Sequence, residues 1–299
     1  MKHIQLLKDK NGFIPSVIDE THWKLGAVTK IPGTPLCDGH WYLAGHVPDG
    51  EKQNYIFESY NCTGFGVSNR YEIIWHFTYG VWRNFSDWWI ALICGTKNPG
   101  NDPHYVAETI REYGLIDETD LPFNASVTEK EWFDRNNITS ERKAKGKQFL
   151  SQHTPLHDWV DSDSDSLRHA LQFSPLGVAV VAWYRGDDGL YYFPEGMKPN
   201  HDTTLADFEV GKFWLIYDTY PDETGSFIKK VKWDTKFPYS SKRYWLGEGT
   251  KRFSDMLINI IKGLITYFTG EVEKKKLEET KPFFPPEKKT ETMQKSKLE

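Results

Sequence analysis

Three side chains in this sequence are of the types that carry out acyl transfer by a thiol. Cys62 precedes Thr-Gly-Phe-Gly, small and apolar residues that could open a buried helix, and His201 and Asp218 follow far downstream. A thiolate is stabilised by a helix N-terminus and by a nearby imidazolium. Asp218 could accept a hydrogen bond from the other ring nitrogen of His201 and hold the imidazole in place. The predicted chemistry is therefore nucleophilic catalysis by Cys62.

A glutamine upstream of the cysteine adds a fourth candidate. The amide of Gln53 could donate to a developing oxyanion, together with the backbone N–H of Cys62. Each candidate also has an ordinary explanation, because a buried cysteine is usually inert and an aspartate before Thr-Tyr-Pro often forms a turn. The joint placement of the four residues is what favours a catalytic group.

The first half of the chain is predicted to be helical. Residues 62–77 carry apolar side chains at roughly helical spacing, which favours a buried helix that begins at Cys62. Ser86 is the predicted N-cap of a second helix that starts with Asp-Trp-Trp-Ile. A third helix is predicted over residues 105–113, with Gly114 as its stop.

The second half is predicted to be rich in strands. Residues 177–184, 211–217 and 226–233 have strand-like composition or alternation. They follow a polar stretch over residues 124–165, with helical Lys/Arg/Glu-rich parts, and a short helix predicted at residues 166–173. Predicted helices in the first half of the chain and predicted strands in the second half indicate the α+β class.

Composition and charge limit the domain number, the partners and the cellular location that the sequence allows. The chain has 299 residues, of which 15% are aromatic, so it can bury a substantial core in one large domain or two modest ones. A net charge of −5 gives no basic footprint for nucleic acid. An odd cysteine count leaves at least one free thiol, and allows one disulfide between Cys37 and Cys94. The N-terminus lacks the apolar run of a secretory signal, which predicts a cytoplasmic or virion-associated location without deciding between them.

The C-terminal residues differ from the body of the chain. An apolar stripe runs along a predicted helix at residues 253–268, and docking on the domain or on a partner is favoured over contact with a membrane surface. We therefore predict one domain over residues 1–250, in which residues 1–50 form a covering segment. An amphipathic helix follows at residues 251–269, and a disordered charged tail at residues 270–299.

Metal binding is not predicted. His40, His46 and Asp49 lie close together in the sequence but lack a zinc-type spacing with cysteines. No cofactor is expected either.

Six local motifs in order resemble the papain-like cysteine peptidases, in a divergent branch of the kind seen in phage and environmental genomes. They cover about residues 30–240. The motifs are a glutamine before a helix-opening cysteine, Ser86-Asp-Trp-Trp, the glycine-rich stretch from Gly95, Gly114-Leu-Ile-Asp-Glu before Pro122-Phe123, Ala170-Leu with a following Pro-Leu-Gly-Val-Ala-Val, and Asn200-His201 before the strand that ends at Asp218.

The resemblance implies a fold, a reaction and a site. The helical half would carry Cys62, and an antiparallel strand-rich half would carry His201 and Asp218. The reaction would be hydrolysis of peptide bonds through an acyl-enzyme, with Gln53 at the oxyanion and a peptide or protein as substrate. A viral source would make the chain virion-associated or cytoplasmic. The substrate cleft would be lined by Gly95, Asn98, Gly100, Asn101 and Asn200.

Two features depart from the family. Its third catalytic member is usually Asn before Ser-Trp-Gly, whereas this chain has Asp218 before Thr-Tyr-Pro, and the spacing from Gln53 to Cys62 is longer than usual. Other readings therefore stay open: another Cys-His-Asp acyl transferase, a cell-wall amidase, or an inactive papain-like module used for binding or as a virion part.

Overall fold

The computed structural model describes residues 12–18, 22, 35–237, 241–248 and 261. The chain divides into two compact units, residues 1–252 and 253–299, and the fold presented here is that of the first unit. The predicted amphipathic helix and charged tail lie outside the described residues, apart from Ile261.

A long central helix, α1 (Cys62–Tyr79), organises the helical half, and its first thirteen residues are all buried. Next come α2 (Asp87–Cys94), with Ser86 as the predicted N-cap, and α3 (Pro103–Tyr113), which is followed by Gly114 as predicted. The remaining helices are η1 (Glu118–Asp120), α4 (Glu129–Trp132), η2 (Arg135–Asn137), α5 (Ser140–Gln152) and α6 (Ser164–Leu171).

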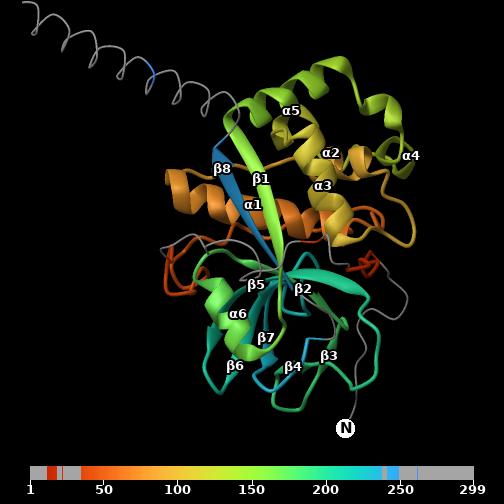
Figure 1. Ribbon diagram of the computed structural model, residues 1–299. Helices are drawn as coiled ribbons and strands as arrows, with labels where there is room; N and C mark the ends of the chain where they lie inside the picture. The colour runs from red at the N-terminus through yellow and green to blue at the C-terminus, as the bar shows by residue number, and fades with distance from the viewer. Residues whose placement is uncertain (1–11, 19–21, 23–34, 238–240, 249–260, 262–299) are drawn as a thin grey trace, which may run out of the picture. The chain divides into compact units, whose positions relative to one another are not determined.

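The second half forms one antiparallel-rich sheet with the strand order β1-β8-β2-β5-β6-β7-β4-β3 among the described residues. Figure 1 shows α1 lying between the sheet and the group formed by α2, α3 and α5. The strands are β1 (His153–Val160), β2 (Leu176–Val180), β3 (Tyr184–Arg185), β4 (Tyr191–Tyr192), β5 (His201–Glu209), β6 (Phe213–Tyr217), β7 (Ile228–Lys232) and β8 (Ser241–Glu248).

The pairing of β5 with β6 sets the positions of two candidate residues. Thr204 pairs with Tyr217, so Asp218 continues β6 opposite the start of β5. Thr203 is the residue opposite Asp218, and His201, the first residue of β5, comes two positions before it, so His201 lies diagonally across from Asp218 on the same face of the sheet.

The two larger apolar clusters among the described residues both include side chains of α1. Phe65, Tyr71 and Ile74 pack with α2 and α3, whereas Ile73 packs with the sheet and α6. Burial on both sides explains why α1 has no clear polar face, unlike a surface helix.

The α+β prediction is confirmed, and most predicted elements are present. One segment was predicted wrongly: residues 153–160, expected within a polar and partly helical stretch, form β1 by pairing with β8. The disulfide that the sequence allowed is absent, since Cys37, Cys62 and Cys94 are all free thiols. No helix among the described residues is long and apolar enough to cross a membrane.

Candidate active site

Cys62 is the first residue of α1 and is fully buried. The first backbone N–H groups of a helix have no partner within the helix and carry partial positive charge, so Cys62 lies at the positive end of the α1 dipole. The preceding residue, Asn61, does not cap the helix with its side chain. Its amide instead bonds to the backbone oxygen of Asp87 at 3.0 Å and to Thr96 at 3.3 Å.

His201 pairs with the carboxylate and lies close to the thiol. Its Nε2 is 2.6 Å from Oδ1 of Asp218, and Cys62 is near enough to contribute to the raised pKa of His201. Because Nε2 is engaged with Asp218, Nδ1 is the nitrogen left for the thiol. Burial alone would lower the pKa of His201, but the charge of Asp218 and the hydrogen bonds to Asp218 and Cys62 outweigh it and raise this pKa to about 10.

Asp218 is a fully buried carboxylate that accepts several hydrogen bonds. Oδ2 accepts a bond from the indole N–H of Trp183 at 2.7 Å and pairs with Lys229 at 2.7 Å. The backbone N–H of Thr219 donates to Oδ1 at 2.7 Å. Burial would raise the pKa of Asp218, but Lys229 and His201 hold it below its ordinary range. The aspartate is therefore ionised, and it favours a protonated His201.

Gln53 lies beside this group but is held by other partners. Its Nε2 donates to the hydroxyl of Tyr220 at 2.6 Å and to Glu58 at 3.0 Å, and its Oε1 accepts from Thr219 at 2.6 Å. The ring of Tyr220 lies 5.1 Å from that of His201. Both amide hydrogens of Gln53 thus have acceptors.

The chain's own N-terminal segment lies on the thiol. A methyl group built on Gly12 would come within 2.5 Å of the sulfur of Cys62, and Phe13 packs against Cys62. The same segment pairs in parallel with Asn101: Ile14 N–H donates to Asn101 at 2.9 Å, and Asn101 N–H donates to Gly12 at 3.3 Å.

The glycine-rich loop presents its backbone to this segment. Gly100 has a φ of 121°, and any Cβ there would collide with the backbone of Gly12 at 2.2 Å, so only glycine allows this approach. Asn101 is braced by a 2.7 Å bond from its amide to Thr96. Gly95, at the C-cap of α2, and Asn98 lie earlier in the loop.

Asn200 supports the strand that carries the histidine. Its backbone N–H donates to Val180 at 3.0 Å, and its side-chain oxygen accepts from the N–H of Ala182 at 2.9 Å. The structure therefore brings together Cys62, His201, Asp218 and Gln53, with the Gly100–Asn101 backbone close by.

Sequence reasoning missed two groups that contact Asp218. Trp183 follows a strand-like apolar run that gives no sign of this contact, and its indole donates to the carboxylate. Lys229 lies in a run of alternating lysines, Ile-Lys-Lys-Val-Lys, in which nothing indicates which lysine is buried. Only the strand pairing reveals that Lys229 faces inward.

The overall fold matches solved cysteine proteases. The chain aligns with procathepsin L 3 of Tenebrio molitor larval midgut at a TM-score of 0.50, with 17% identity over 71% of each chain. It also aligns with the proform of the ragweed pollen cysteine protease Amb a 11 at a TM-score of 0.51, with 17% identity over 81% of this chain and 73% of the other.

This chain has the papain-like fold. The fold expected from the sequence motifs is thus confirmed. No model of a protein family matches the sequence, and no curated protein matches it. The chain therefore resembles the solved papain-like structures in fold, at a sequence identity of 17%.

Proposed function

We propose that this papain-like protein is a cysteine peptidase. The observation that carries the proposal is the buried pair of His201 and Asp218, 2.6 Å apart, beside the fully buried thiol of Cys62 at the N-terminus of α1. A thiol, an imidazole and a carboxylate linked in this order are the components of thiol-dependent acyl transfer.

The reaction follows from the roles of these groups. The Cys62 sulfur attacks the peptide carbonyl carbon, and the proton carried by His201 passes to the leaving amine. The C–N bond breaks and leaves an acyl group on the sulfur. His201 then takes a proton from water, and the resulting hydroxide cleaves the thioester and releases the acid. Asp218 keeps the imidazole oriented throughout and stabilises its charged form.

The oxyanion would be held by the backbone N–H of Cys62 and by Gln53. The Gln53 amide donates to Tyr220 and Glu58 in the free protein, so its participation requires exchange of one of these bonds for the oxyanion. Tyr220 and Glu58 stay bonded to each other at 2.7 and 2.8 Å, which lowers the cost of that exchange.

The substrate would bind along Gly100 and Asn101. The N–H and C=O of Asn101 are the groups to which residues 12–14 now bond, and an extended peptide could replace this segment there. Gly12 lies against the sulfur, so the segment and a substrate compete for the same place.

Labelling of the thiol tests the proposal. An epoxide-type cysteine-protease inhibitor should modify Cys62 in the full chain or in a Gly12→Val variant, detected by mass spectrometry of the labelled peptide. Cys94 is the matched control, since burial raises the pKa of its thiol to about 12 and makes it unreactive. Cleavage of a peptide pool should disappear in Cys62→Ser.

The outcomes separate the candidate functions. Labelling without peptide cleavage would favour another Cys-His-Asp acyl transferase, for which the carboxylate of Asp218 is an ordinary third member. Absence of label at Cys62 in both proteins, with the fold intact by circular dichroism, would favour a binding module and reject the enzyme.

A further inference from the structure

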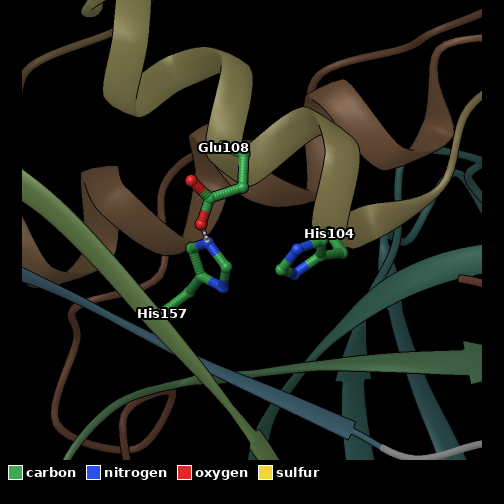
Figure 2. A group of neighbouring side chains, drawn as sticks. All are labelled: His104, Glu108 and His157. Carbon is green, nitrogen blue, oxygen red and sulfur yellow. Dashed lines mark hydrogen bonds and ion pairs between the residues drawn. The ribbon is translucent and has the colours of Figure 1, made fainter. Parts of the chain in front are cut away.

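Three metal-ligating side chains converge between α3 and β1. His104 and Glu108 are one turn apart on the same face of α3, and His157 points toward them from β1 (Figure 2). One ligand atom from each residue can be chosen so that all lie within 4.8 Å of one another. None of these residues belongs to the thiol site.

The distances suit a small cation. Tetrahedral zinc with bonds of about 2.0–2.2 Å needs donor atoms roughly 3.3–3.5 Å apart. Nε2 of His157 and Oε1 of Glu108 are 2.8 Å apart, so a cation could replace the shared proton if they separated by about half an ångström. The ring centre of His104 is 5.2 Å from that of His157. Rotation of the His104 side chain would bring one of its ring nitrogens to the cation.

The charges around the group are mixed. The carboxylate of Glu108 contacts one imidazole, that of His157, and one guanidinium, that of Arg111. Arg111 pairs with Glu108 at 2.8 Å and would compete with a cation. Glu108 and Arg111 are both more than 40% exposed, so Arg111 can swing away into water.

We propose that His104, Glu108 and His157 form a binding site for a divalent transition-metal ion, and zinc is the ion that their donor set fits. Two imidazoles and one carboxylate favour zinc over magnesium or calcium, which prefer all-oxygen sites. Three protein ligands leave a fourth position for water. The ring centre of His22 lies 3.9 Å from that of His104.

The site would link the two halves of the fold. α3 belongs to the helical half and β1 to the sheet, so a bound ion adds a cross-link between them. The N-terminal segment contacts the same helix end, since the backbone N–H of His104 donates to Ser16 at 3.2 Å. A bound metal is therefore expected to stabilise the folded chain.

The experiment uses the full chain with Cys62→Ala, because a thiol beside an imidazole could itself bind the metal. After treatment with a chelator and its removal, Zn²⁺ is titrated by calorimetry and Co²⁺ by its visible absorption. We expect one saturable site, a tetrahedral cobalt spectrum, and weaker binding as the pH falls below about 6.5, where imidazoles become protonated.

Variants assign the site. Glu108→Gln and His157→Asn should each weaken binding by more than about 100-fold, beyond the effect typical of an outer-shell partner. Arg111→Met should tighten binding, because it removes the competing cation. His76→Asn is the matched control, since His76 and His46 form another imidazole pair at 3.0 Å.

Two results would overturn the proposal. One is the lack of saturable binding to the folded chain that carries Cys62→Ala. The other is binding that survives Glu108→Gln and His157→Asn but is lost in His76→Asn, which would move the site to the second pair of imidazoles. The cobalt spectrum of the chain with both ligands intact reports coordination even if a ligand variant fails to fold.

Discussion

Lys229 and Asp218 form a buried ion pair at 2.7 Å, and both side chains are at most 1% exposed. The lysine approaches the carboxylate from β7, on the side opposite to His201, and it also donates to the backbone oxygen of Tyr220. Its ammonium lies 5.2 Å from the centre of the Trp183 ring. The orientation of the His201 imidazole thus depends on a cation outside the proposed group of Cys62, His201 and Asp218.

Replacing this lysine should damage both stability and activity. Lys229→Met leaves a buried carboxylate with one cationic partner fewer, and loss of one member of such a pair costs about 3–5 kcal/mol. Urea unfolding measures the loss. Lys230 is the exposed neighbour of Lys229, so Lys230→Met is the matched control. It should change the free energy of unfolding by less than about 0.5 kcal/mol. Equal effects of the two substitutions would contradict the role given to the buried pair.

A second prediction concerns acidic side chains around α1. Burial raises the pKa of Glu118 to about 8, with a smaller contribution from nearby Glu51 and in spite of a bond from Phe123 N–H. Burial and the charge of Glu51 also raise the pKa of Glu72 and Asp87. The folded protein therefore holds protons that the unfolded chain would release.

The sign of the pH effect follows from these shifts. A raised carboxyl pKa gives a stabilising contribution that is complete below about pH 4.5 and is lost as the pH rises toward 8. The free energy of unfolding should fall over this window, and Glu118→Gln should flatten part of the fall. Exposed Glu195→Gln should leave the slope unchanged. A slope that is the same in all three proteins would contradict the assignment.

A third prediction separates the two possible roles of Gln53. If its amide serves the oxyanion, Gln53→Ala should lower the kcat of peptide hydrolysis by about 10²–10³-fold. Alkylation of Cys62 by iodoacetamide forms no oxyanion, so its rate should change little. If Gln53 only holds Tyr220 and Thr219 in place, both rates should fall together.

The sequence was informative where the site depends on local order. The helix start at Cys62 could be predicted from the small residues that follow it, and the strand that ends before Asp218 from its run of apolar residues. The contacts of Lys229 could not be predicted, because they arise from the pairing of β6 with β7 rather than from any local pattern.

The histidine–glutamate group was missed for a similar reason. His104 and Glu108 have helical spacing, but their partner His157 lies in a segment expected to be polar and partly helical. That segment becomes a strand only through pairing with β8, which joins it far later in the chain. Non-local strand pairing of this kind leaves little trace in the local sequence.

The last prediction concerns access to the thiol. Gly12 leaves no room for a side chain, since a Cβ would lie 2.5 Å from the Cys62 sulfur and 3.1 Å from its backbone nitrogen. Gly12→Val should therefore lift the segment and break its bonds to Asn101. We expect Cys62 to be alkylated at least about tenfold faster, since the two lost hydrogen bonds, of about 1 kcal/mol each, and the lost packing of Phe13 all favour opening.

A substitution of an exposed residue in the same segment serves as the control for Gly12→Val. Val17 lies in the same segment but is 83% exposed, so Val17→Ala should leave the alkylation rate unchanged. Deletion of residues 1–18 should reproduce the effect of Gly12→Val. If neither change speeds alkylation while the fold stays intact, another element limits access to the sulfur. The burial of Cys62 would then belong to the domain itself and not to the segment that lies on it.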